Sequence, residues 1–181
     1  RPEAVPEYAL LGQHDRDTIK ELREQLNEEQ AGEQLLDRDA SWTNKREALR
    51  IIFGAGLRPA RQMAFDDFKR RRGRRLRDFA LWCVLCEHYG NDWRQWDEDL
   101  QRPTSPRVAK LHNDYLDEIT FNEWLQWVSW NQLSDAQQAA QDAGMPVGIV
   151  TDLAVGVSGA SADTWMMSDI YAQDISVGAP P

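Results

Sequence analysis

One stretch of the sequence, GIVTDLAVGV (148–157), decides how the whole chain is interpreted. It consists of an apolar, β-branched run, the single acid Asp152, and a second apolar run. Residues 147–151 are short and apolar enough to form a strand that is buried on both faces. The backbone N–H and C=O groups of a buried strand must be paired, yet the sequence contains no second strong strand. We therefore expect the partners of this strand to lie outside these 181 residues.

Helical periodicity dominates the residues before this strand. Asp17 is placed to cap the first predicted helix, Trp42 lies on the inner face of the second, and Gly73 permits a break between the third and the fourth. Trp93 and Trp96 are expected to pin the polar, proline-broken loop before the fifth helix. The helices are predicted at residues 17–30, 41–53, 59–72 and 76–89, in a short run that opens at 105–106, and at 119–143.

The composition, 41% hydrophobic and 28% charged residues, is typical of one soluble globular domain. No stretch approaches the ~18 uninterrupted apolar residues of a membrane helix, and the first residues, RPEAVPEY, lack the apolar centre of a signal peptide. The formal net charge of -9 argues against nucleic acid as a partner. The sequence therefore predicts a cytoplasmic protein without a membrane or nucleic-acid partner.

The two cysteines stand in WCVLC (82–86), which resembles the redox motif WCxxC. That motif requires a strand to deliver the first thiol to a helix N-terminus, where its pKa falls. Cys83 and Cys86 instead lie inside an amphipathic helical run, which favours inert packing over a thiol oxidoreductase. Together with His88 they would supply only three ligands, and a structural zinc normally takes four. We therefore expect both thiols to react slowly.

A basic run, KRRRGRRLR (69–77), contains seven basic residues and no acid. Such a cluster could bind phosphate groups, but basic runs are common and unspecific. Core-like apolar residues, among them Phe68 and Leu76, bracket the run, so two solvated helix faces that meet at Gly73 are the favoured interpretation.

Three tryptophans, Trp124, Trp127 and Trp130, share one helix face, where core packing is favoured over stacking on sugars. The role of Asp152 is open on spacing alone. An acid at the end of a parallel strand is typical of the active-site face of a (β/α)₈ barrel, whereas the Gly- and Ser-rich residues after it are equally compatible with a turn or a helix cap.

Four segments resemble one family. EWLQW (123–127), GMPVGIVTDLAVGV (144–157), ADTW (162–165) and SVGAPP (176–181) are similar in wording and order to the 4-α-glucanotransferases, or amylomaltases, of glycoside hydrolase family 77. The similarity is dense over 121–181 and looser upstream. It implies an α-amylase-like barrel with helical insertions that cuts an α-1,4-glucan and holds part of it covalently. That part is then transferred to the 4-hydroxyl of glucose or another glucan, without a metal or organic cofactor.

The resemblance also assigns the parts of the chain. It implies a mainly α fold in which residues 1–145 are a helical insertion subdomain of the barrel, and residues 146–181 are one barrel strand with its following loop. The family pattern places the nucleophile, the acid/base and a third acid after 176–181, so the fragment alone is predicted to be inactive. Asp152 matches the aspartate of the DLAVG motif and is implied to bind substrate, although Thr151 stands where many members have arginine.

Two further expectations concern the fragment as a separate molecule. Without its partners, the strand is expected to be disordered, to pack irregularly on the helices, or to pair with a second copy by edge addition. The rival interpretation is a stand-alone helical module that binds a partner through the basic run or the Trp-rich surface.

Overall fold

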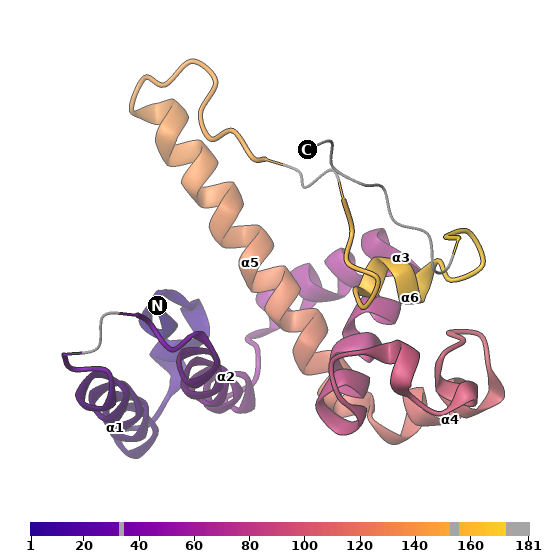
Figure 1. Ribbon diagram of the computed structural model, residues 1–181. Coiled ribbons are helices and arrows are strands. Elements are labelled where there is room, and N and C mark those ends of the chain that lie inside the picture. The colour runs from indigo at the N-terminus through magenta and orange to yellow at the C-terminus, as the bar shows by residue number, and fades with distance from the viewer. Residues whose placement is uncertain (33–34, 153–155, 173–181) are drawn as a thin grey trace. The chain divides into compact units, whose positions relative to one another are not determined.

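The computed structural model describes residues 1–32, 35–152 and 156–172 (Figure 1). In this part of the chain every regular element is a helix. The α-helices are α1 (Gln13–Glu29), α2 (Arg38–Gly54), α3 (Pro59–Tyr89), α4 (Pro106–Asp114), α5 (Leu116–Asp142) and α6 (Ala162–Met166). Short 3-10 turns lie at η1 (Pro2–Ala4), η2 (Pro6–Leu10), η3 (Trp93–Gln95) and η4 (Glu98–Leu100).

The prediction of a mainly α fold is confirmed, whereas the predicted strand is not formed in the described residues. Residues 147–151 have no regular secondary structure and no neighbouring strand in the described part of the chain, and Gly148 adopts φ 75°. The backbone groups of a strand need hydrogen-bond partners on a neighbouring strand. Here the segment contacts the α-helix α5 instead. Residues 153–155 of the same motif and the segment SVGAPP lie outside the described residues.

Local sequence signals account for some of the helix boundaries, whereas α1, α2 and α5 begin three or four residues before their predicted starts. α4 begins at Pro106, as expected, and Ser105 Oγ accepts a hydrogen bond from the Val108 N–H at its start. Gly73 has φ 59° and ψ −142°, so α3 breaks where the sequence predicts. The cap predicted at Asp17 is wrong, because α1 begins four residues earlier and Asp17 accepts a hydrogen bond from Gln13 within the helix (2.8 Å).

The chain divides into two units, Arg1–Asp66 and Asp67–Pro181. In the first unit α1 packs on α2, and Arg61 donates two hydrogen bonds (2.7 and 3.1 Å) to the buried carboxylate of Glu7. Trp42 was predicted on the inner face of α2 but is 50% exposed, which corrects that prediction. The division after residue 145, between insertion and barrel, stays a prediction.

The second unit contains a hydrophobic core of buried side chains. It joins the second half of α3, the 3-10 turns η3 and η4, α4, the start of α5 and α6. Trp93 and Trp96 are buried in it, which confirms their predicted role in pinning the loop. The buried members are Ala80, Leu81, Val84, Leu85, Cys86, Trp93, Trp96, Leu100, Val108, Ile119 and Trp165. Among the described residues, no helix is both long enough and apolar enough to cross a membrane.

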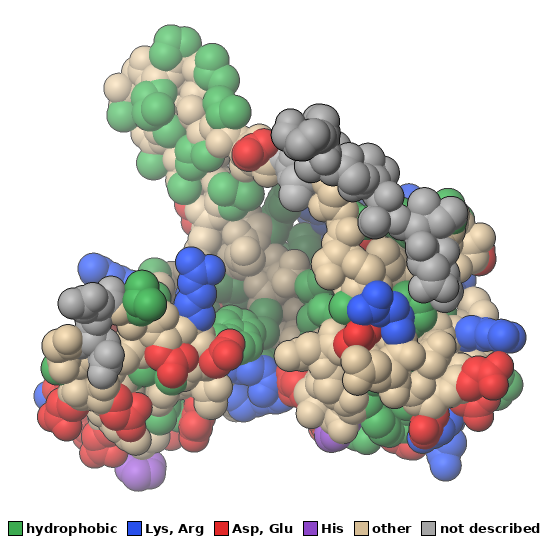
Figure 2. Space-filling view, viewed as in Figure 1, with side chains coloured by type: hydrophobic (Ala, Val, Ile, Leu, Met, Phe, Trp, Pro, Cys, Tyr) green, Lys and Arg blue, Asp and Glu red, His purple; other side chains and the backbone are tan. Residues whose placement is uncertain are grey.

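Helix α5 has two different halves. Trp124 and Trp127 in its first half are buried, as predicted from their helical spacing. Trp130 and Leu133 in its second half are 50% and 46% exposed, so the predicted core role is wrong for Trp130. Figure 2 shows hydrophobic side chains gathered over the far end of α5 and the segment that follows it.

Candidate functional site

The segment that carries Asp152 leaves α5 through a tight turn. The Gly144 N–H donates to Gln141 C=O (2.9 Å) and the Met145 N–H to Ala140 C=O (3.1 Å). Gly144 adopts φ 86°, a left-handed conformation that glycine tolerates better than any other residue. The chain then returns along the last turns of α5 toward Asp152.

Gln137 on α5 holds this returning segment. Its Nε2 donates to Val147 C=O (3.2 Å), and its Oε1 accepts from the Ile149 N–H (2.7 Å). Gly148 between them has φ 75° and is buried under the carboxamide, so a Cβ there would lie 2.5 Å from Gln137 Nε2. The role of Gln137 is not predictable from the sequence, because a polar side chain on a helix gives no signal of partners ten and twelve residues away.

Asp152 ends the described part of this segment as an exposed carboxylate. Within the described residues no hydrogen bond or ion pair engages it, and its neighbour Thr151 supplies no charge. Thr151 lines a small hollow of about 220 Å³ beside α5, together with Trp130, Leu133, Ser134, Gln137 and Ile149. A solvent-facing carboxylate of this kind accepts hydrogen bonds from hydroxyl groups. Asp152 is therefore accessible to solvent among the described residues, and its role in substrate binding stays a prediction.

The ADTW motif forms α6, which is docked firmly in the core of the second unit. Trp165 is fully buried and its Nε1 donates to Leu100 C=O (2.9 Å). Thr164 Oγ1 accepts from Trp93 Nε1 (3.1 Å), and the Trp96 and Trp165 rings meet edge to face at 6.2 Å. The motif therefore anchors the chain beyond Asp152 to the helices.

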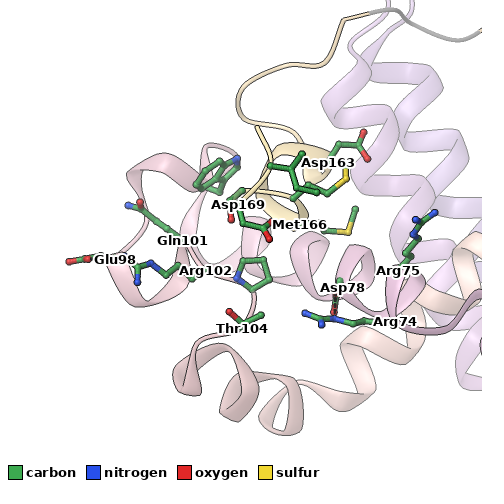
Figure 3. Close-up of a pocket in the computed structure, with 15 residues that line it drawn as sticks. Arg74, Arg75, Asp78, Glu98, Gln101, Arg102, Thr104, Asp163, Met166 and Asp169 are labelled. Carbon is green, nitrogen blue, oxygen red and sulfur yellow. Dashed lines mark hydrogen bonds and ion pairs between the residues drawn. The ribbon is translucent and has the colours of Figure 1, made fainter. Parts of the chain in front are cut away.

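A wider groove of about 1220 Å³ lies beside α6, between the second half of α3 and residues 98–104 (Figure 3). Its polar lining includes Arg74, Arg75, Asp78, Glu98, Gln101, Arg102, Thr104, Asp163 and Asp169. Arg74 and Asp78 pair with each other at 2.9 Å. Both signs of charge are mixed along the groove, so its electrostatics select neither an anion nor a cation.

The cysteines are packed inside α3. Cys86 is buried and Cys83 is half-buried, and both are free thiols. No cluster of three His, Cys, Asp or Glu side chains suited to a metal ion occurs among the described residues. His88 instead contacts Glu118 (3.2 Å) and stacks on Tyr115. This arrangement supports the interpretation of both cysteines as packing residues.

Burial raises the pKa of the Cys86 thiol from 9.0 to about 12, with the charge of Glu87 adding to the effect. Because only the thiolate is nucleophilic, we expect iodoacetamide to label Cys86 at neutral pH about a thousandfold more slowly than an exposed cysteine. Mass spectrometry of alkylated peptides measures this rate, and the same chain in urea is the control. Labelling of native Cys86 at the rate found in urea would contradict the buried assignment.

The basic run finds partners within its own unit. Arg70 and Arg71 pair with Asp67, and Arg72 lies over the ring of Trp130, 4.1 Å from its centroid. Glu123 of the EWLQW motif is buried; burial raises its pKa, and the charges of Lys69 and Arg77 oppose that rise. The run is thus engaged by nearby acids and an aromatic ring, which supports the interpretation as solvated helix faces rather than a phosphate site.

Comparison with known proteins confirms the family resemblance that the four sequence segments indicate. The profile of the 4-alpha-glucanotransferase family matches residues 3–181. Over its whole length the chain is 42% identical to 4-alpha-glucanotransferases of Mycobacterium bovis and Mycobacterium tuberculosis, and it covers 25% of each. It is 32% identical, over 67% of its length, to the Haemophilus influenzae 4-alpha-glucanotransferase, of which it covers 19%. The chain thus spans about a quarter or less of these relatives, and it belongs to the 4-alpha-glucanotransferase family, glycoside hydrolase family 77.

Proposed function

We propose that this chain is part of a retaining 4-α-glucanotransferase, which moves a segment of an α-1,4-glucan to the 4-hydroxyl of glucose or of another glucan. The observation that carries the proposal is the 42% identity over the full chain to proteins named for that activity. The exposed carboxylate of Asp152, at the end of the segment that α5 and α6 bracket, is compatible with a place beside the substrate.

The retaining mechanism requires two carboxyl groups about 5–5.5 Å apart. One attacks the anomeric carbon and forms a covalent glycosyl-enzyme, while the other protonates the leaving oxygen and later deprotonates the incoming hydroxyl. The family pattern places both groups after residues 176–181. In this proposal the described residues bind and position the glucan, and the covalent chemistry belongs to the remainder of the enzyme.

Asp152 has the clearest role among the described residues. Its carboxylate would accept hydrogen bonds from glucose hydroxyls, and charge-assisted bonds of this kind are about twice as strong as neutral ones. Because Thr151 stands where many family members have arginine, Asp152 has no arginine beside it in the sequence. In this proposal the Asp152 carboxylate therefore binds the sugar rather than forming a salt bridge within this segment. The reaction is transfer rather than hydrolysis when a sugar hydroxyl, and not water, attacks the glycosyl-enzyme.

The remaining parts of the proposal follow from the chemistry. The substrates are α-1,4-glucans and maltooligosaccharides, and glycosyl transfer by two carboxylates requires no cofactor. A cytoplasmic location is part of the proposal, and the free thiols Cys83 and Cys86 are compatible with a reducing compartment. Self-association of the separate chain through residues 147–151 stays a prediction.

The test is disproportionation of maltotriose by the protein expressed from its complete reading frame. We expect glucose to be released together with chains longer than maltotriose, and labelled glucose to be incorporated into those chains. Chromatography of the products measures both. The 181-residue chain alone, assayed beside it, should give no turnover. Shorter products without any longer ones would indicate hydrolysis and contradict the proposal.

A further inference from the structure

The groove beside α6 has three walls, all within the second unit (Figure 3). The second half of α3 supplies one wall at residues 74–78, and residues 98–104 supply another. The third consists of α6 and the turn after it, residues 163–170. The volume of about 1220 Å³ exceeds the roughly 300–1000 Å³ of pockets that enclose a single small molecule. The size of the groove therefore favours an extended ligand.

The walls are joined to one another by contacts within the protein. Trp165 Nε1 on α6 donates to Leu100 C=O (2.9 Å), which connects two of the walls directly. Gln101 Nε2 donates to Trp96 C=O (2.8 Å) and fixes residues 98–104 from the other side. Trp165 and Leu100 are both fully buried, in the core that also contains the second half of α3. A site that is already formed loses little conformational entropy when a ligand binds, which favours affinity.

Two ion pairs neutralise part of the charge in the groove. Arg74 pairs with Asp78 at 2.9 Å, and Arg102 lies 3.7 Å from Glu98. Each pair combines one positive and one negative side chain, so neither contributes a net charge to the lining. These pairs leave the selectivity of the groove to its remaining charged groups.

The remaining charged side chains are Arg75, Asp163 and Asp169. All three are exposed, and none has a side-chain hydrogen bond or ion pair among the described residues. A guanidinium only donates hydrogen bonds and a carboxylate only accepts them, whereas a hydroxyl does both. A charged ligand would be repelled by one of the two kinds of group, but a neutral ligand with several hydroxyls can bind both.

The same groove also has apolar lining. Its apolar side chains are Trp93, Pro103, Met166, Met167 and Ile170. Sites for organic ligands typically combine apolar surface with a few polar groups that fix the orientation of the ligand. A sugar ring matches this combination, because its C–H faces are apolar and its edge carries hydroxyls.

From this arrangement we propose that the groove beside α6 binds a segment of an α-1,4-glucan. Arg75 donates hydrogen bonds to the sugar hydroxyls, and Asp163 and Asp169 accept hydrogen bonds from them. The inference rests on the proposed function, in which α-1,4-glucans are the substrates. It adds residues of α3 and α6 to the single substrate contact that is predicted at Asp152.

The test is a titration of the 181-residue chain with maltoheptaose, followed through the backbone amide chemical shifts in heteronuclear NMR spectra. The amides of residues 163–170 should shift and approach saturation at about 1 mM, the affinity of a few hydrogen bonds on an open surface. Arg75→Ala and Asp169→Ala should each weaken binding about tenfold, the loss of one hydrogen bond to a charged group. Maltose should bind more weakly than maltoheptaose, because it reaches fewer of the walls.

Arg70→Ala and Asp135→Ala are the matched controls and should leave the affinity unchanged, because both remove exposed charges of the same unit outside the groove. Loss of the shifts on Asp152→Ala would assign them to the segment at Asp152 and overturn the proposal. Equal affinity for an α-1,6-linked glucan of the same length, or shifts that never saturate, would make the groove an unspecific surface and overturn it as well. Maltotriose turnover of the complete protein reports separately on the proposed function, so the two failures are distinguishable.

Discussion

Trp165→Ala is expected to lower the free energy of unfolding of the second unit by about 3–5 kcal/mol, the usual cost of emptying a large aromatic site in a core. Trp165 is fully buried among the core residues of α3, η4 and α6, so its removal leaves a cavity. The Leu100 carbonyl also loses its donor, and the edge-to-face contact with Trp96 disappears. Urea unfolding of the chain, followed by far-UV circular dichroism, measures the change.

Two matched substitutions separate the causes. Trp165→Phe keeps most of the ring volume and loses the N–H, so it should cost about 1–2 kcal/mol. Trp130→Ala removes an equally large but half-exposed ring and should cost about 1 kcal/mol or less, including its contact with Arg72. Equal losses for Trp165→Ala and Trp130→Ala would mean that α6 does not dock through its tryptophan.

Asp152→Ala in the complete protein is expected to lower kcat/KM for maltotriose roughly 10- to 100-fold, the loss of one or two hydrogen bonds to a charged acceptor. Asp152 is exposed and has no partner among the described residues, so its removal should leave stability unchanged. A fall in activity without a change in the unfolding midpoint therefore reports on substrate binding. Initial rates of glucose release over a range of maltotriose concentrations measure the effect.

The controls for Asp152 are one conservative and one distant substitution. Asp152→Asn keeps the shape and removes the charge, so it should retain more activity than alanine if hydrogen bonding rather than charge matters most. Asp135→Ala removes another exposed acid of the same unit, on α5, and should leave turnover unchanged. Unchanged turnover with Asp152→Ala would remove this residue from the substrate site.

Local signals predicted much of the fold correctly. Gly73 breaks α3, and Ser105 caps α4. Trp93 and Trp96 are buried and fix the loop between α3 and α4. The first two features depend on the conformational range of one residue or on neighbours a few positions away, whereas the two tryptophans also contact the distant residues Thr164 and Trp165. Such signals are present in the sequence itself, because helices form their backbone hydrogen bonds within about four residues.

The failures share a different origin. Trp42 and Trp130 follow helical periodicity, yet both are half exposed. Periodicity shows which residues share a face and leaves open what that face packs against. The same limit hid the role of Gln137, whose partners lie beyond the end of its helix.

The sequence by itself determined the helical class, the C-terminal ends of α1, α2, α3 and α5 to within one residue, and membership in the 4-alpha-glucanotransferase family, since these depend on local patterns and on motifs kept in order. Only the tertiary structure decided that Trp165 bonds Leu100, that Gln137 holds residues 147–149, and that Asp152 stands exposed. Contacts between residues far apart in the chain carry no periodic signal. A β-strand depends wholly on such contacts, and among the described residues the apolar run before Asp152 has no neighbouring strand.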